Sequence, residues 1–301
     1  MTVLVAGATG SIGKEVTAAL LARGAAVRAL VRSHGRAALL PAGAEPVVGD
    51  LRNAASVAAA LHGVTAALYV SPHDADEELM AEHFVAACER LGVRLVFAGV
   101  AMTGQNPVVR WCIQAMVSTF LPHYKGKLRI ARRVATAGRT RPVVFSVANY
   151  YQNDELVRDE ILGGQYPLPA HRAGINRIDL RDVGEVVARA MTDPGFPSGA
   201  HGLVGPASIS GAGSARIWAD VLGRPVRYTG DRLDWQDLLA DRLHGAKLAD
   251  YRRSYGFLAK HGLPTPAREL AATAALLGRP PRAYETYVRD MAERWCAPRR
   301  S

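Results

Sequence analysis

Cysteine is scarce in this chain of 301 residues. The three cysteines, Cys88, Cys112 and Cys296, lie far apart, and their spacing matches neither a metal site nor a redox pair. This usage is typical of proteins that work in a reducing compartment without structural disulfides. The N-terminus also has no charged-then-apolar segment of the kind that directs secretion. We therefore expect a cytoplasmic protein.

Long apolar runs are absent as well. No stretch approaches the roughly 18 consecutive apolar residues of a membrane-spanning helix, so no membrane association is expected. The apolar content of 49% with 21% charged residues is ordinary for a folded protein and excludes a disordered chain. The length is sufficient for a large core and for two structural lobes.

Acidic residues are fewer than basic ones, with 27 Asp and Glu against 37 Lys and Arg, which gives a formal net charge of +10. Such a balance raises the question of a nucleic-acid partner. The basic residues are spread along the chain, and no helix-turn-helix, zinc or aromatic-basic motif accompanies them. We therefore do not expect nucleic-acid binding, and we interpret Arg129 to Arg141 as a solvated helix face. A patch for an acidic partner or substrate is the alternative.

What the chain does have, at its start, is a buried strand that runs directly into a glycine-rich turn and a helix. Gly7, Gly10 and Gly13 follow the apolar segment 3–6 at the spacing Gly-x-x-Gly-x-x-Gly. In such turns the glycines allow the tight bend, the approach of a pyrophosphate and close packing of the helix on the strand. The helix N-terminus then offers unpaired N–H groups to the anion. The sequence therefore predicts a dinucleotide site that also includes Thr9, Ser11 and Ile12.

Strands and helices alternate through the first half of the chain. Apolar strands are predicted at residues 3–6, 26–31, 46–48, 66–70, 93–98 and 141–147, with helices between most of them. This pattern predicts an α/β fold, a doubly wound parallel Rossmann sheet with a smaller, mostly helical C-terminal lobe interwoven with it. We expect the Rossmann domain to span 1–150 and the substrate or partner lobe 151–301, with about 175–205 returning to the Rossmann domain. Proline and glycine are dense around 193–206.

The end of the second strand indicates which nucleotide binds. No acidic residue lies between Glu15 and Glu45, where one would contact the ribose hydroxyls of NAD(H) and repel a 2′-phosphate. Arg32 and Ser33 stand there instead, and the arginine offers a planar fork to a phosphate. We therefore favour NADP(H) over NAD(H), the alternative being that Arg32 is a solvated arginine. Asp50 and Leu51, after the third strand, are expected to meet the adenine edge or to form only a turn.

These segments, taken together, resemble the NmrA-like branch of the atypical short-chain dehydrogenases/reductases. The resemblance rests on the turn at 7–13, the strand ending in Arg32, Gly49-Asp50-Leu51, the segments 60–64 and 181–187, and Gly278-Arg279-Pro280-Pro281. It covers nearly the whole chain and implies a bound NADP(H) or NAD(H) and a cleft between two lobes. The family contains reductases of quinones, dyes, imines and ketones, and also cofactor-sensing regulators that catalyse nothing.

The catalytic residues depart from the pattern of short-chain reductases, which place a Tyr one helical turn before a Lys and a Ser after the fifth strand. That Ser is missing here, and Thr103 is the nearest hydroxyl. The Lys position falls on Lys127, predicted to contact the nicotinamide ribose, and His123 occupies the position of the Tyr. Residues four apart share a helix face, so His123, or Tyr124, is the candidate proton donor. The alternative is an ordinary solvated helix start.

Two further loops are expected to border the nicotinamide, because ligands of doubly wound sheets lie beyond the carboxyl ends of the strands. Ser71 follows the fourth strand, and Tyr150 and Asn153 follow the sixth; the resemblance implies a recurring Asn at position 153. The carboxylates at 74–78 are interpreted as a helix start favoured by the helix dipole, and no metal site is expected. An aromatic lining of the cleft is expected from Tyr150, Tyr151, Trp218 or Trp235.

Three hypotheses follow. The first is an NADP(H)-dependent reductase of a small apolar or aromatic substrate such as a carbonyl, quinone or similar conjugated acceptor. The second is a catalytically silent NADP(H) sensor, favoured by the missing Ser and Tyr. The third is a biosynthetic enzyme that retains the fold without redox chemistry. An oligomer is compatible with all three.

Overall fold

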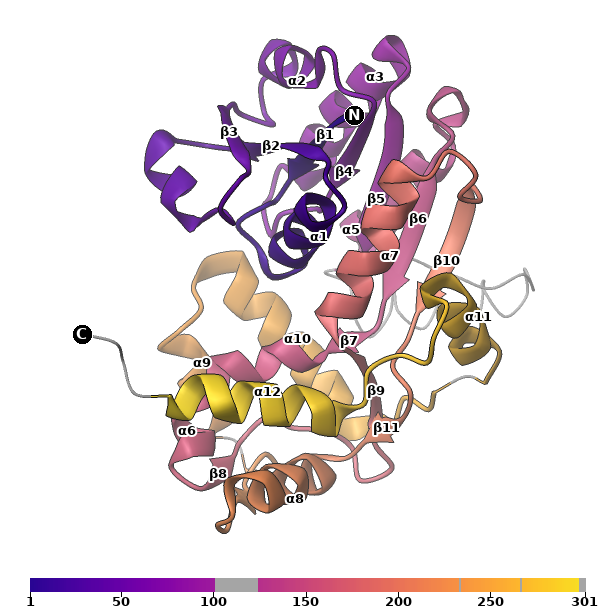
Figure 1. Ribbon diagram of the computed structural model, residues 1–301. Coiled ribbons are helices and arrows are strands. Elements are labelled where there is room, and N and C mark those ends of the chain that lie inside the picture. The colour runs from indigo at the N-terminus through magenta and orange to yellow at the C-terminus, as the bar shows by residue number, and fades with distance from the viewer. Residues whose placement is uncertain (101–123, 233, 266, 298–301) are drawn as a thin grey trace. The chain divides into compact units, whose positions relative to one another are not determined.

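The computed structural model describes residues 1–100, 124–232, 234–265 and 267–297. The chain divides into two compact units, each built from two stretches of sequence (Figure 1). Unit 1 comprises Met1–Val147 and Leu180–Leu203, and unit 2 comprises Ala148–Asp179 and Val204–Ser301. The expected positions 123 (His123) and 103 (Thr103) lie outside the described residues.

Unit 1 is built on a seven-stranded sheet in the order β10-β6-β5-β4-β1-β2-β3, and every neighbouring pair of strands is parallel. The strands are β1 (Thr2–Ala6), β2 (Ala26–Val31), β3 (Glu45–Val48), β4 (Ala66–Tyr69), β5 (Arg94–Gly99), β6 (Val143–Val147) and β10 (Gly199–Leu203). The prediction of a doubly wound parallel Rossmann sheet is confirmed, and the six predicted strands lie within two residues of these bounds.

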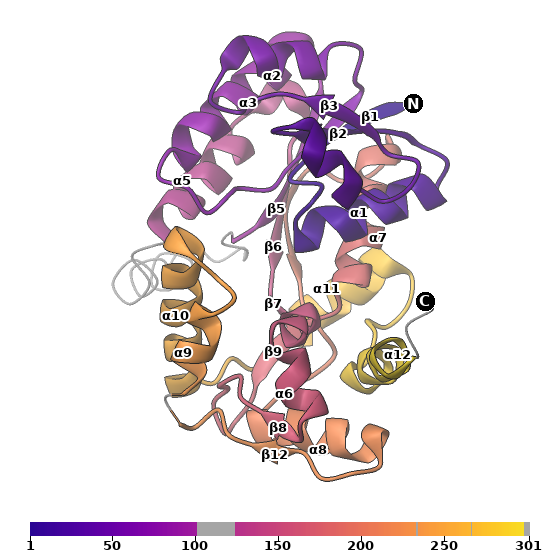
Figure 2. The same cartoon turned by 90° about the vertical axis from the view of Figure 1, so that its left-hand side faces the viewer.

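Helices cover both faces of this sheet (Figure 2). One face carries α1 and α7, which pack on each other, and the other carries α2, α3 and α5. Their bounds are α1 (Ser11–Ala22), α2 (Ala54–Leu61), α3 (Glu77–Leu91), α5 (Tyr124–Ala135) and α7 (Leu180–Thr192), with short 3-10 helices η1 (His34–Leu39) and η2 (Gly138–Thr140). Because both faces are covered, the central strands are largely apolar, and residues Val3 to Ala6 of β1 have no exposed surface.

The seventh strand was not expected. β10 pairs with β6 from Gly199 opposite Val143 to Leu203 opposite Val147. Its sequence, Gly-Ala-His-Gly-Leu, lacks the β-branched run that identifies a strand, and it lies in the Pro- and Gly-dense stretch. Pairing with an existing sheet edge, rather than local preference, makes this segment a strand.

Unit 2 combines small sheets with helices. A three-stranded sheet has the order β11-β9-β7, and a two-stranded sheet pairs β12 with β8. The elements are β7 (Asn149–Tyr150), η3 (Tyr151–Val157), α6 (Arg158–Leu162), β8 (Gln165–Tyr166), β9 (Ile175–Ile178), β11 (Ser208–Ile209), α8 (Gly211–Leu222), β12 (Arg227–Tyr228), α9 (Trp235–Ala240), α10 (Gly245–Lys260), α11 (Ala267–Leu277) and α12 (Tyr284–Cys296). The predicted helical content of the C-terminal part is confirmed.

The core of unit 2 is rich in aromatic side chains. Tyr151 and Trp218 have no exposed surface, and Trp235 is only 4% exposed. All three pack in one apolar cluster with residues of α12. The expectation that they line a cleft is therefore wrong: at these positions the aromatic rings supply buried apolar area, which stabilises the fold. Tyr150, by contrast, is half-buried.

Candidate functional site

The glycine-rich turn of unit 1 joins β1 to α1. Gly7 has a φ of +91°, and the Gly10 N–H donates to the Gly7 carbonyl oxygen at 2.9 Å. A Cβ atom added at Gly13 would stand 2.1 Å from the Gly7 oxygen, so no residue other than glycine fits. The turn therefore brings the start of α1 against the end of β1, as the sequence predicted.

The N-terminus of α1 is open to an anion. Its first residue, Ser11, is exposed, no side chain of Gly10 can cap it, and no acidic residue lies in its first turn. The first N–H groups of a helix lack partners within the helix, and the helix dipole adds positive potential there. Together with the glycine cradle, this N-terminus suits the pyrophosphate of a dinucleotide, with Thr9 and Ile12 half-buried beside it.

The turn also lies at the point where the strand order reverses. From β1 the chain goes to β2 and β3 on one side and to β4, β5 and β6 on the other. A Cβ atom added at Gly7 would contact Val70, the residue after β4, at 3.2 Å. Ligands of doubly wound sheets bind in the crevice outside such a reversal, so Gly7 and the neighbouring Ser71 border the expected site.

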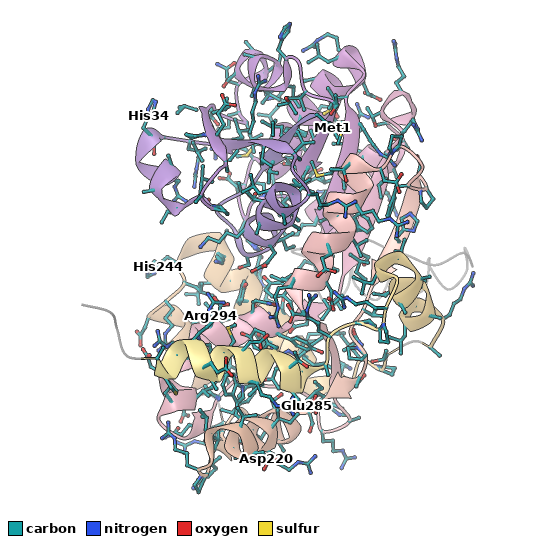
Figure 3. The ribbon with its side chains drawn as sticks, in the orientation of Figure 1. Met1, His34, Asp220, His244, Glu285 and Arg294 are labelled. Atoms are coloured by element: carbon teal, nitrogen blue, oxygen red, sulfur yellow. The ribbon has the colours of Figure 1, made fainter. Side chains whose placement is uncertain are left out.

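Arg32 and Ser33 follow β2 directly. Both side chains are exposed, and neither makes a hydrogen bond or ion pair with another described residue. His34, which begins η1, is exposed on the outer side of the same turn (Figure 3). The planar guanidinium of Arg32 is therefore available to a phosphate next to the crevice.

Asp50 and Leu51 form the turn after β3. The Asp50 carboxylate accepts a hydrogen bond from the Arg52 N–H at 2.9 Å, and the Ser56 hydroxyl oxygen accepts one from the Asp50 N–H at 3.0 Å. The Leu51 carbonyl oxygen lies 3.1 Å from Nδ1 of His83. The turn that the sequence allowed is present, and contact of these residues with an adenine stays a prediction.

Lys127 is held in a small polar cluster with Glu77 and Ser71. Its Nζ donates to Glu77 Oε2 at 2.8 Å and to the Pro72 carbonyl oxygen at 3.2 Å, and the Ser71 hydroxyl donates to the same Oε2 at 3.0 Å. The side chains of Lys127 and Glu77 are only 7% and 13% exposed. Sequence reasoning missed this partner, because 50 residues separate it from Lys127.

Gly126 explains how α5 comes so close to α3. A Cβ atom at this position would lie 2.4 Å from Glu77 Oε1, so the glycine leaves room for the carboxylate beside Lys127. Tyr124, the first residue of α5, is half-buried. The role of Tyr124 or His123 as proton donor stays a prediction, as does the contact of Lys127 with a ribose.

The other basic residues of α5 pair with the acidic residues of α3. Arg129 holds Glu78 through two hydrogen bonds of 2.6 and 2.5 Å, and Arg133 holds Glu82 at 2.7 Å and Glu89 at 2.8 Å. These pairs are more exposed than Lys127 and Glu77. Much of the local concentration of positive charge is thus neutralised within unit 1.

Tyr150 and Asn153 belong to unit 2. The Tyr150 hydroxyl lies 3.1 Å from the Tyr251 hydroxyl, which in turn donates to Asn153 Oδ1 at 3.3 Å. Asn153 Nδ2 is 3.5 Å from Asn149 Oδ1. The two predicted residues therefore share one polar chain, and their contact with a nicotinamide stays a prediction.

Unit 2 also contains a buried ion pair. Arg177 donates to Asp154 at 2.6 Å, and the side chains are 3% and 0% exposed. Asp154 also accepts from Tyr166 at 2.9 Å, from Trp218 at 3.2 Å and from Tyr284. Burial alone would lower the pKa of Arg177, but Asp154 raises it well above its ordinary value, so the guanidinium stays charged.

Comparison with known proteins shows to which family the chain belongs. A model of the NmrA-like family matches residues 1–238. The chain belongs to the NmrA-like family. The match includes all of unit 1, with the glycine turn, Arg32 and the Lys127 cluster, and part of unit 2.

Individual relatives of this NmrA-like protein are reductases. An NAD(P)H azoreductase from Xenophilus azovorans is 29% identical over 240 residues, which cover 77% of this chain and 78% of that one. A (4-alkanoyl-5-oxo-2,5-dihydrofuran-3-yl)methyl phosphate reductase from Streptomyces griseus is 28% identical over 308 aligned positions, covering 97% and 98%. Among solved structures, an NADPH-dependent quinone oxidoreductase from Escherichia coli in complex with NADPH has a TM-score of 0.76 at 20% identity, covering 96% and 99%.

The described part of this NmrA-like chain contains neither a cluster of metal ligands nor a membrane-spanning helix. Among the described residues, no group of three His, Cys, Asp or Glu side chains is arranged to hold a metal ion. No helix within the described ranges has the length and apolar character needed to cross a membrane. Asp74 and Asp76 instead bind Arg52, a partner that sequence reasoning missed although it adjoins Asp50-Leu51.

Proposed function

We propose that this NmrA-like protein is an NADP(H)-dependent reductase of a small apolar carbonyl, quinone or similar conjugated acceptor. The observation that carries the proposal is the open anion cradle of α1, with the unpaired Arg32 and Ser33 at the end of β2. The nicotinamide, when bound, supplies a hydride to the acceptor, and a proton completes the reduction. The azo and quinone reductases among its relatives support this acceptor class.

Each part of the cofactor has a candidate partner in the chain. The N–H groups of residues 9 and 11–13 would hold the pyrophosphate, Arg32 and Ser33 the 2′-phosphate, and Asp50 and Leu51 the adenine edge. An ammonium has three donors, and Lys127 uses two of them, on Glu77 and Pro72. The third donor is available to a ribose hydroxyl near Ser71. Tyr150 and Asn153 are proposed to contact the nicotinamide.

The test is NADPH consumption by the purified protein with a panel of quinones, aromatic ketones and azo dyes, after binding of NADPH is established. Replacing Arg32 by Asp should weaken NADPH binding about 10- to 100-fold, because it removes charge-assisted hydrogen bonds to the phosphate and adds repulsion. NADH binding should change little. Arg139→Asp is the matched control, since Arg139 is exposed in η2, before the amino end of β6. Equal losses for both nucleotides would refute the assignment of Arg32.

A second function, a catalytically silent NADP(H) sensor, is favoured by one observation. The charge of Lys127 is already neutralised by Glu77, so less of it is available to lower the pKa of a neighbouring acid. A sensor binds NADPH and NADP⁺ with very different affinities and consumes neither with any acceptor. Stoichiometric oxidation of NADPH by one acceptor of the panel would exclude the sensor and the non-redox enzyme together.

A further inference from the structure

Arg52 joins two loops of unit 1. Both oxygens of Asp74 accept from its Nη2 at 2.7 Å, and Asp76 accepts from its Nε at 2.9 Å. Its backbone N–H is held by Asp50. The loop after β3 is thereby tied to the loop after β4, on the carboxyl side of the sheet where the cofactor is proposed to bind.

Asp74 is an anion in the neighbourhood of Arg32. A hydrogen bond from the Asp76 N–H lowers the pKa of Asp74 most, followed by Arg52, and the charge of Arg32 lowers it further. Asp74 is therefore ionised at neutral pH and feels the field of Arg32. Without a partner, such a carboxylate would attract the Arg32 guanidinium and would repel a second anion bound to it.

A carboxylate near this position is the feature by which dinucleotide sites reject a 2′-phosphate. The chain has no such residue at the end of β2, but Asp74 approaches the same region from β4. Arg52 engages both of its oxygens, and Arg32 makes no ion pair with any described residue. The negative charge is thus neutralised by one arginine, and the other stays available.

We propose that Arg52 determines the preference for NADPH over NADH without binding the cofactor, by neutralising Asp74 and leaving Arg32 free for the 2′-phosphate. The inference rests on the proposed function for the place of that phosphate at Arg32. It assigns specificity to the residue that directly follows Asp50-Leu51.

The experiment measures binding of NADPH and of NADH to the full chain by fluorescence titration, with no acceptor present. Arg52→Ala should weaken NADPH binding about tenfold, because it leaves the carboxylates of Asp74 and Asp76 unpaired at the edge of the sheet where the phosphate is proposed to bind, and NADH binding less than about twofold. Adding Asp74→Asn to Arg52→Ala should restore most of the NADPH binding, whereas adding Asp76→Asn in its place should restore less, because the charge of Arg32 acts on Asp74. Arg133→Ala is the control, because Arg133 of α5 likewise pairs with two carboxylates, but these belong to helix α3 and not to the loops after β3 and β4.

Each outcome of this experiment supports or overturns the inference. Equal losses of NADPH and NADH in Arg52→Ala would show a general structural role and overturn the inference. Failure of Asp74→Asn to rescue would also overturn it, because the unpaired charge of Asp74 would then not be the cause of the loss. If the wild-type chain binds NADPH no better than NADH, or if Arg32→Asp leaves the preference unchanged, the proposed phosphate site fails first. If Arg32→Asp abolishes the preference for NADPH but Arg52→Ala leaves it unchanged, the proposed phosphate site stands and only the role of Arg52 is refuted.

Discussion

Two buried ion pairs, one in each unit, differ in which of their charged groups has its hydrogen-bonding capacity filled. In unit 2, Asp154 accepts from Arg177, Tyr166, Trp218 and Tyr284, and lies in the aromatic core. In unit 1, Glu77 pairs with Lys127 at the carboxyl edge of the sheet, and the ammonium has two acceptors among the described residues, which leaves its third donor without a described partner. Both oxygens of the Asp154 carboxylate are thus occupied and cannot accept from a ligand, although Nε of Arg177 has no hydrogen-bond partner among the described residues, whereas the Lys127 ammonium keeps a donor. We therefore expect the first pair to serve folding and the second to serve binding.

The largest effect should come from breaking the pair in unit 2. Asp154→Asn removes the charge that compensates Arg177, leaves a buried cation, and should lower the free energy of unfolding by about 3–5 kcal/mol. Urea denaturation followed by circular dichroism measures the change.

A matched control lies in the same core. Tyr255 is 3% exposed, and its hydroxyl has no hydrogen-bond partner among the described residues. Tyr255→Phe should therefore change the free energy of unfolding by less than about 0.5 kcal/mol, or raise it. A loss for Asp154→Asn no larger than that for Tyr255→Phe would show that the pair is dispensable for folding.

The next largest effect is expected when the charge of Glu77, the partner of Lys127 in unit 1, is removed. Glu77→Gln keeps the shape of the side chain but removes the charge that holds Lys127, and should raise the KM for NADPH about tenfold as the ammonium loses its position beside the crevice. Stability should fall by about 1–3 kcal/mol, less than for Asp154→Asn. Steady-state kinetics with one acceptor and urea denaturation measure the two quantities.

Glu78→Gln is the control, because Glu78 is the adjacent residue of α3 and pairs with Arg129 in the open. Its KM for NADPH should equal that of the unaltered protein. If Glu77→Gln costs stability as much as Asp154→Asn and leaves binding unchanged, both pairs are structural and the contrast between the units is wrong.

The smallest expected effect is on the pH dependence of the free energy of unfolding, through the Glu78 carboxylate. The hydrogen bonds from Arg129 lower the pKa of Glu78. A carboxylate whose pKa is lower in the folded state stabilises it above the unfolded pKa of about 4.3, and loses this contribution as the pH falls through the folded pKa. Because the Glu78 side chain is 47% exposed, the contribution is about 0.2–1 kcal/mol and is screened by salt. Unfolding of Glu78→Gln between pH 3 and 6 should show a shallower dependence; an identical slope would contradict the assignment.

Most of the fold of unit 1 could be predicted from local sequence patterns. The apolar run of β1, the three glycines and the basic end of β2 are each recognisable within a few residues of sequence. Because β1 and β2 are parallel neighbours, the residues that follow them lie at the same edge of the sheet. β10 was missed because its Gly and Ala residues acquire strand geometry only by pairing with β6. The partners Glu77 and Asp154 were missed for a related reason, since no spacing links residues that meet only after the sheet and the helices have formed. The aromatic residues of unit 2 were assigned to a cleft because composition does not distinguish a core from a surface.

The way the chain enters and leaves unit 1 has a consequence during synthesis. Residues 1–147 emerge first, but α7 and β10, which cover α1 and β6, lie at 180–203. At about 5–20 residues per second, the nascent sheet waits some seconds for its last strand, with the edge of β6 exposed. Co-translational folding of unit 1 is therefore expected to finish only after the first stretch of unit 2 has left the ribosome, and a chain interrupted between 147 and 203 is expected to aggregate.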